Sequence, residues 1–137
     1  MDMLKRALIG MLGVLAAGGA AVAQDAPANG DPALGERVFV KCKACHQIGE
    51  GAHNAVGPEL NGLIGRHSAS VPGYSYSEAM KNSGLVWDEA TFKDYIKDPK
   101  AKVPGTKMAF AGLQKQGDID NITAYLKSFA PDGKKAP

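Results

Sequence analysis

The chain has 137 residues, and its 16 lysine and arginine residues nearly balance 14 aspartate and glutamate residues, for a formal net charge of +2. This balance, without a basic stripe that alternates with aromatic residues, argues against a nucleic-acid-binding protein. The length fits one small domain, whose few aromatic side chains and many glycines leave room for a bound apolar group to complete the core.

Residues 1–23 have the pattern of a secretory signal peptide. Lys5 and Arg6 form a short basic start, an apolar run follows, and residues 21–23 (Ala-Val-Ala) are a small-residue cleavage site. A retained membrane anchor is the alternative, because the apolar run approaches the ~18 residues that span a bilayer. The glycine and alanine content of the run and the cleavage site favour removal. We therefore expect an exported, periplasmic protein that begins at residue 24 and has no membrane span after cleavage.

The mature chain opens with residues 24–30, which are rich in alanine, proline, asparagine and glycine and indicate a flexible leader. Asp31 is a good N-terminal cap and Pro32 suits the first helical position, so a helix is predicted to begin there. We expect this helix to run into Cys42, and the folded domain to span residues 31–130.

Residues 42–46 read Cys-Lys-Ala-Cys-His, the attachment signature of a c-type haem. Two thiols three positions apart can each add to one vinyl group of the same porphyrin. His46, directly after Cys45, then lies under the iron as the proximal ligand and binds through a neutral imidazole nitrogen. The motif predicts one haem c, which contains iron and is held by thioether bonds from Cys42 and Cys45.

Two other uses of a Cys-x-x-Cys pair fit the sequence less well. A dithiol redox motif normally occurs in a strand-helix-strand context, and no such alternation is visible. A zinc site needs two further ligands at a suitable spacing. The chain has no other cysteine, and His53 and His67 do not have that spacing. Haem attachment is therefore the leading interpretation.

The segment that follows the motif, residues 47–73, has no helical or strand period and is punctuated by glycine and proline, which indicates a long loop. A short helical turn fits residues 60–64, and a short helix fits residues 77–82. Asp88 then caps a longer helix, which Pro99 brings to an end.

A second long loop is predicted from Pro99 to about residue 116. Asp118 caps the last helix, in which apolar residues recur at intervals of three and four until residue 130. Residues 131–137 should form a flexible tail. The pattern is all-α with two long loops, and loops of this length in a compact domain are usually functional. A haem between the loops would explain both.

A second axial ligand for the iron could come from either methionine that remains after cleavage, Met80 or Met108. Met80 lies in a short helical stretch, where a methionine most simply packs in the core. Met108 lies in the second loop, which can direct a thioether at a metal without following a helix face. Placement favours Met108, and core packing remains the general alternative for a lone methionine.

The second loop and several other motifs resemble class I cytochromes c, above all mitochondrial cytochrome c and the bacterial cytochromes c2 and c550. The similarity covers about residues 33–130 and keeps the order and spacing of the motifs. These are Gly57-Pro58-Glu59-Leu60-Asn61-Gly62, Gly65-Arg66, Pro72-Gly73-Tyr74-Ser75-Tyr76-Ser77, Gly84-Leu85-Val86-Trp87, Asp98-Pro99-Lys100, Pro104-Gly105-Thr106-Lys107-Met108, Phe110-Ala111-Gly112 and Tyr125-Leu126-Lys127.

The resemblance implies a small all-α cytochrome c fold, in which the first and last helices cross at Gly35, Phe39 and Tyr125. It implies that His46 and Met108 are the two axial ligands of the iron. The other haem-site residues that it implies are Pro58, whose carbonyl would hold the His46 ring; Arg66, Tyr76 and Trp87, which would contact the haem propionates; and Tyr95 and Thr106, which would form a hydrogen-bonded floor near Met108. Without the resemblance, the aromatic residues could be ordinary core residues and Arg66 a surface charge.

The implied function is a soluble periplasmic one-electron carrier rather than an enzyme, because His/Met ligation leaves no open position on the iron for a substrate. The implied partners are a cytochrome bc1-type donor and, as acceptor, a terminal oxidase, a reaction centre or a periplasmic reductase. The carrier would be a monomer. A haem peroxidase-like enzyme is the alternative if Met108 is not a stable iron ligand, and a thiol oxidoreductase that uses Cys42 and Cys45 is a third class.

Comparison with the family pattern shows one departure and predicts one further surface feature. Met80 departs from it, because mitochondrial relatives carry a polar asparagine there, near a buried water beside the haem, so the redox potential is not predicted. The lysines on the ligand-bearing segments predict a basic docking rim around the exposed haem edge. These are Lys41, Lys43, Lys100, Lys102, Lys107 and Lys115.

Overall fold

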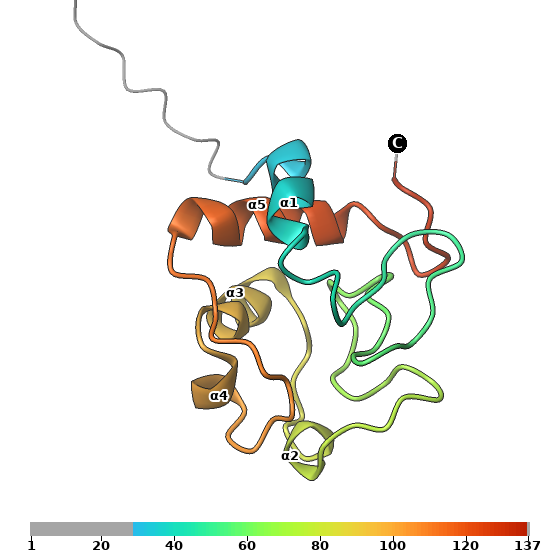
Figure 1. The fold of residues 1–137 in the computed structure, drawn as a ribbon, viewed down its shortest axis with the longest axis vertical. Helices are drawn as coiled ribbons and strands as arrows, with labels where there is room; N and C mark the ends of the chain where they lie inside the picture. The colour runs from blue at the N-terminus through green and yellow to red at the C-terminus, as the bar shows by residue number, and fades with distance from the viewer. Residues whose placement is uncertain (1–28, 137) are drawn as a thin grey trace, which may run out of the picture.

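The computed structural model describes residues 29–136. The predicted signal peptide at residues 1–23, and the leader as far as residue 28, lie outside these residues. The described part forms five helices joined by long irregular segments (Figure 1): α1 (Pro32–Phe39), α2 (Glu78–Lys81), α3 (Glu89–Lys97), α4 (Pro99–Lys102) and α5 (Gln116–Lys127). It contains no strand, only isolated bridges that join His67 to Val86 and Phe129 to Lys135. The predicted all-α class is confirmed.

Helix α1 begins where the sequence predicts but ends earlier. The Asp31 side chain accepts a hydrogen bond from the backbone N–H of Ala33 at 2.7 Å, and Pro32 occupies the first helical position. The expectation that this helix runs into Cys42 is wrong, because α1 ends at Phe39. The N–H of Cys42 bonds to the carbonyl of Phe39, three residues earlier, at 2.8 Å. Bonds of this spacing form tight turns, so the cysteines lie on turns rather than on a regular helix.

Helices α1 and α5 cross in close contact, as Figure 1 shows at the top of the fold. Gly35 permits the contact, since a Cβ atom built there would lie only 2.0 Å from the carbonyl oxygen of Asn121. Aromatic rings fill the crossing: the ring centroids of Phe39 and Tyr125 are 5.4 Å apart, and those of Tyr125 and Phe129 are 5.1 Å apart. The crossing implied at Gly35, Phe39 and Tyr125 is therefore present.

Helices α2 and α3 are each capped by the side chain of the preceding residue: Asp88 is the cap that the sequence predicts, whereas Ser77 was expected as the first residue of its helix. The Ser77 hydroxyl accepts a hydrogen bond from the N–H of Met80 at 3.1 Å. The Asp88 carboxylate accepts one from the N–H of Thr91 at 2.7 Å. Both contacts satisfy backbone donors that have no partner inside a first helical turn. The helical turn expected at residues 60–64 is a hydrogen-bonded turn and not a helix.

Helix α4 was not expected, because the whole segment after α3 is predicted to be a loop. Asp98 ends α3 and also caps α4, since its side chain accepts a hydrogen bond from the N–H of Ala101 at 3.1 Å. Pro99 occupies the first helical position, which its ring favours. A helix as short as α4 shows no amphipathic period, so only its cap and its proline could have indicated it.

Helix α5 has different ends from those predicted. It begins at Gln116, and Asp118 lies in the first turn instead of capping the helix, which has no side-chain cap. A carboxylate in the first turn still favours the helix through the helix dipole. The helix ends at Lys127 rather than at residue 130.

The segment after α5, expected as a flexible tail at residues 131–137, turns back toward the helix in its described part. The N–H of Ala136 donates to the carbonyl of Ser128 at 2.8 Å. Gly133 packs so closely on the loop below that a Cβ there would lie 2.3 Å from the carbonyl oxygen of Gly49. These contacts are not those of a free tail.

The buried core lies where α1 and α3 pack on α5. Ile119 and Ile122 of α5 are each 1% exposed, and Phe92 and Ile96 of α3 are each 4% exposed. None of the described helices is long and apolar enough to cross a membrane. The long loops lie below this helical layer (Figure 1). They contribute most of the lining of the cavity described next.

Candidate functional site

A cavity of about 500 Å³ lies between the loops and the lower face of the helices. Its volume is in the range of pockets that hold cofactors and small ligands. The lining comes from segments far apart in the sequence, which the fold brings to one place. All the predicted site residues line it: Cys42, Cys45, His46, Pro58, Arg66, Tyr76, Trp87, Tyr95, Thr106 and Met108.

Cys42, Cys45 and His46 form one wall of the cavity on consecutive turns. The N–H groups of Cys45 and His46 both bond to the carbonyl of Cys42, at 3.1 and 3.0 Å. Both cysteines are half-buried and form no disulfide. Burial raises the pKa of the Cys42 thiol to about 11. A thiol with a raised pKa is a poor nucleophile, which argues against the dithiol redox interpretation.

The His46 ring is held by its neighbours in a defined orientation. Its Nδ1 atom lies 2.7 Å from the carbonyl oxygen of Pro58, which can only accept, so Nδ1 carries the proton. The Nε2 atom is then the unprotonated nitrogen that could bind a metal. Burial lowers the pKa of His46, which favours the neutral ring that a metal needs. Gly57 lies against the ring, since a Cβ there would be 2.3 Å from His46 Cε1.

Met108 lines the cavity from the second loop, and its surroundings fix its side chain. The Tyr95 hydroxyl donates to Met108 Sδ at 3.1 Å, and the Thr106 hydroxyl accepts a hydrogen bond from the N–H of Met108 at 3.3 Å. The buried Trp87 ring packs against Tyr95 with a centroid separation of 4.8 Å. The residues expected to form a floor near Met108 are therefore together.

Met80, the other methionine of the described chain, lines the same cavity from α2 and is buried. Its sulfur lies 3.8 Å from the Ser83 hydroxyl. It packs with the core cluster, as the sequence suggests for a methionine in a short helix. No tyrosine hydroxyl is bonded to its sulfur among the contacts of the described residues, in contrast to Met108.

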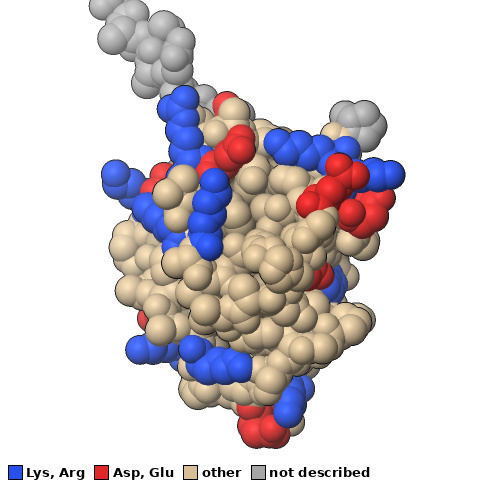
Figure 2. Space-filling model, turned by 45° about the vertical axis from the view of Figure 1, so that its right-hand side comes forward, with Lys and Arg blue, Asp and Glu red and all other residues tan. Residues whose placement is uncertain are grey.

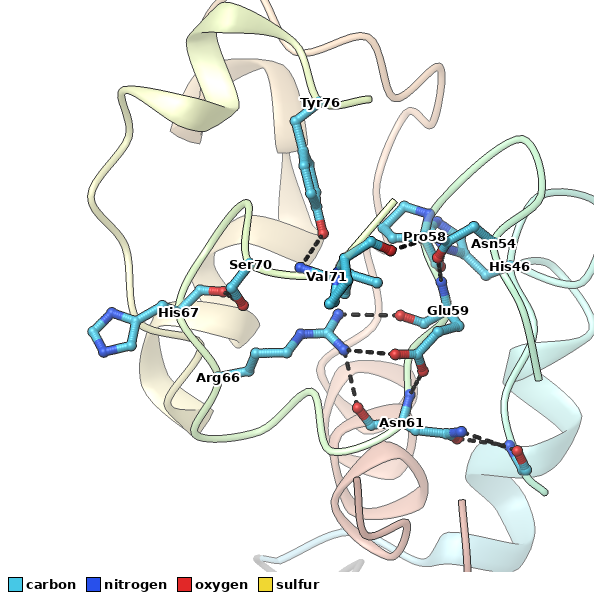
Figure 3. A network of polar contacts seen from close by, with 12 residues as sticks. His46, Asn54, Pro58, Glu59, Asn61, Arg66, His67, Ser70, Val71 and Tyr76 are labelled. Atoms are coloured by element: carbon cyan, nitrogen blue, oxygen red, sulfur yellow. Dashed lines mark hydrogen bonds and ion pairs between the residues drawn. The ribbon is translucent and has the colours of Figure 1, made fainter. Parts of the chain in front are cut away.

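Arg66 and Tyr76 line the cavity and also bond to the protein backbone, as Figure 3 shows. The Arg66 guanidinium donates to the carbonyls of Asn61 and Glu59, at 2.9 and 3.1 Å, and pairs with the Glu59 carboxylate at 3.6 Å. The Tyr76 hydroxyl accepts a hydrogen bond from the N–H of Val71 at 3.2 Å. Burial raises the pKa of Tyr76, so its hydroxyl keeps a proton to donate toward the cavity.

These side chains suit a covalently attached haem. One wall offers two thiols and an imidazole nitrogen, the Met108 loop offers a thioether, and most of the lining is apolar. Within residues 29–136, no group of three or more His, Cys, Asp and Glu side chains could hold a metal ion. The sequence analysis did not assign roles to several residues at the site. These are Gly57, whose missing side chain makes room for the His46 ring, Glu59, and the apolar wall of Leu60, Leu63, Phe92 and Phe110.

The predicted lysine rim is only partly free to attract a partner. Figure 2 shows a broad uncharged face with basic side chains above and below it. Lys41 lies 3.6 Å from Asp118 and Lys102 lies 3.7 Å from Asp94. Lys107 donates to the carbonyl of Ser75 and lies over the Tyr74 ring. The other three rim lysines are exposed and form no ion pair within the described part of the chain: Lys43, Lys100 and Lys115.

Comparison with known proteins identifies similar chains. The Cytochrome c family model matches residues 32–130. Cytochrome c-554 of Methylosinus trichosporium is 63% identical over 116 residues, which cover 85% of this chain and 88% of that protein. Cytochrome c2 of Blastochloris viridis is 53% identical over 131 residues, which cover 95% and 98%. Among solved structures, cytochrome cH from Methylobacterium extorquens aligns with 72% of this chain and 98% of its own, with 48% identity and a TM-score of 0.67.

Proposed function

The chain belongs to the cytochrome c family, and we propose that it is a soluble, exported one-electron carrier whose haem iron is ligated by His46 and Met108. It is an electron-carrier cytochrome with one covalently attached haem c, and Cys42 and Cys45 fit the attachment motif. The observation that carries the proposed ligation is the placement of Met108 Sδ at the cavity, fixed by the Tyr95 hydroxyl at 3.1 Å.

Each residue at the attachment wall has a distinct task in this proposal. Cys42 and Cys45 hold the cofactor covalently, so that it does not dissociate during repeated encounters with partners. Pro58 fixes the His46 ring, which leaves Nε2 as the ligating nitrogen and increases its basicity. The haem supplies the one-electron iron couple when bound.

Met108 and the residues that hold it would keep other ligands away from the iron. Met108 would take the coordination position that a substrate or peroxide needs, and a thioether ligand would favour the reduced iron. Tyr95 and Thr106 hold Met108 at its sulfur and at its backbone N–H. Arg66, Tyr76 and Trp87 would anchor the propionates at the cavity lining. A closed and rigid site of this kind suits electron transfer and does not suit catalysis.

The proposed place of action is the periplasm, where the predicted signal peptide would deliver the chain. The proposed partners are a cytochrome bc1-type donor and an acceptor that is a terminal oxidase, a reaction centre or a periplasmic reductase. A monomer suits a carrier that must dock with two partners in turn. The exposed lysines Lys43, Lys100 and Lys115 would guide these encounters by charge.

The test is a combined measurement on the purified holoprotein. We expect a mass equal to residues 24–137 plus one haem, retention of the haem through acid-acetone extraction, and a one-electron redox titration. The oxidised protein should show a low-spin c-type spectrum with a methionine–iron band. A high-spin spectrum together with rapid peroxide turnover would contradict the carrier and support the peroxidase-like alternative.

A further inference from the structure

An ion pair between Glu59 and Arg66 lies at one wall of the haem cavity. Arg66 lines the cavity, whereas Glu59 is set behind it. The Glu59 side chain is 21% exposed and the Arg66 side chain 16%, which makes this the least exposed ion pair among residues 29–136. Figure 3 shows the carboxylate facing the guanidinium, with 3.6 Å between Glu59 Oε1 and Arg66 Nη1. A partly buried positive charge therefore borders the cofactor site with one carboxylate beside it.

Two backbone carbonyls hold the Arg66 guanidinium in addition to the Glu59 carboxylate. Backbone carbonyls of Asn61 and Glu59 accept hydrogen bonds from the two terminal nitrogens of the guanidinium, at 2.9 and 3.1 Å. The Glu59 carboxylate accepts a further bond from the N–H of Asn61 at 2.6 Å, which a side-chain amide oxygen could also accept. The Asn61 side chain is itself fixed by two hydrogen bonds with the backbone of Gly49, at 2.8 and 2.9 Å. Glutamine at position 59 would thus remove the charge, while its amide oxygen can keep the bond to Asn61 and the two carbonyls still hold Arg66.

The two charges act on the redox equilibrium in opposite directions. Reduction adds an electron to the cofactor, so a nearby positive charge favours the reduced form and a nearby negative charge opposes it. A unit charge about 10 Å from another changes an equilibrium about twofold even at the dielectric constant of water, and by more at a poorly solvated site. Salt screens partly buried charges much less than exposed ones.

We propose that Glu59 compensates the charge of Arg66 and so lowers the midpoint potential of the haem. This inference rests on the proposed carrier function, which places the redox couple in the cavity that Arg66 lines. It assigns part of the potential of this chain to a loop carboxylate that does not touch the cofactor site.

The experiment compares the midpoint potentials of five holoproteins: wild type, Glu59→Gln, Arg66→Gln, the double variant, and Glu89→Gln. At a fixed applied potential, Glu59→Gln should raise the ratio of reduced to oxidised haem at least about twofold, which is about 18 mV for a one-electron couple. Arg66→Gln should lower this ratio, and the double variant should lie above Arg66→Gln. Glu89 pairs with Lys127 at the exposed surface, so Glu89→Gln should leave the ratio unchanged. The shift in Glu59→Gln should persist at high salt.

An unchanged or lowered potential in Glu59→Gln, with wild-type helicity and visible spectrum, would overturn the inference. Shifts of the same sign in both single variants would also overturn it, because they indicate a structural disturbance. If Glu59→Gln yields no holoprotein, the double variant decides, since it leaves no unpaired charge. If the midpoint potential of the double variant equals that of Arg66→Gln, compensation by Glu59 is refuted; if it is higher, compensation is supported. A missing methionine–iron band in wild type would refute the proposed ligation instead, and that outcome is read from the spectrum alone.

Discussion

Replacing Gly35 with alanine should weaken the crossing of α1 and α5. The added Cβ would lie 2.0 Å from the carbonyl oxygen of Asn121 and 2.6 Å from Tyr125 Cβ, whereas real Cβ contacts are essentially never shorter than 3.0 Å. Because the obstructing oxygen belongs to backbone, the helices must separate, and overpacking of this kind costs up to about 3 kcal/mol. The better helix propensity of alanine offsets about 1 kcal/mol of this loss. We therefore expect the free energy of unfolding to fall by about 2 kcal/mol.

The assay is thermal and urea unfolding of the holoprotein, followed by circular dichroism. A loss of about 2 kcal/mol lowers the Tm by roughly 8 to 16 °C in a domain of this size. Gly117→Ala is the matched control, because Gly117 lies in α5 with no neighbouring atom within 4 Å of an added Cβ. That variant should gain up to about 1 kcal/mol. If Gly35→Ala is as stable as wild type while Gly117→Ala gains stability, the reasoning about the helix crossing is wrong.

Three further predictions follow from the site and the surface. The double change Cys42→Ser and Cys45→Ser should abolish haem attachment and most of the helical circular dichroism, because the cofactor fills the cavity; full helicity without haem would contradict this. Charge reversal at Lys43 and Lys100, which form no ion pair within residues 29–136, should slow second-order electron transfer at low ionic strength, and the slowing should shrink in ~0.15 M salt; an unchanged low-salt rate removes these lysines from docking. Asp120→Asn should destabilise the protein less at pH 3 than at pH 7, as measured by urea midpoints. The hydrogen bond from Lys93 lowers the pKa of Asp120 below 3.8, so the stabilisation that the Asp120 carboxylate contributes is present above that pH and is lost as the pH falls. An equal loss of stability in Asp120→Asn at pH 7 and pH 3 would refute this linkage.

Helix starts were predicted best where a capping side chain marks the first turn. Asp88 caps α3 as expected, since its side-chain oxygen bonds to a free backbone N–H, and Ser77 caps α2 in the same way without having been predicted to do so. The start of α5 was misplaced because Asp118 has a side chain that often caps helices, whereas the residue at the cap position, Lys115, makes no side-chain cap bond. The early end of α1 at Phe39 could not be read from the sequence, because the turns after it depend on where the attachment motif must face.

The predicted site residues all line one cavity, whereas the conformation of the irregular segments that carry them was not predicted. The attachment motif is local, so Cys42, Cys45 and His46 are found directly in the sequence. Placement in the second loop already favoured Met108 over Met80, and the Tyr95 hydroxyl that donates to the Met108 sulfur supports that choice. The ion pair of Glu59 with Arg66 was not predicted, because a loop has no period that indicates which side chains face one another.

The central claim is that Met108 binds the haem iron, and one spectroscopic comparison tests it directly. The oxidised spectra of wild type, Met108→Ala and Met80→Leu are recorded, with and without added imidazole. We predict that Met108→Ala loses the methionine–iron band, binds imidazole readily and has a lower midpoint potential. Met80→Leu should keep the band, with a modest packing effect, because Met80 packs in the core cluster. A band that survives in Met108→Ala and disappears in Met80→Leu would contradict the ligand assignment.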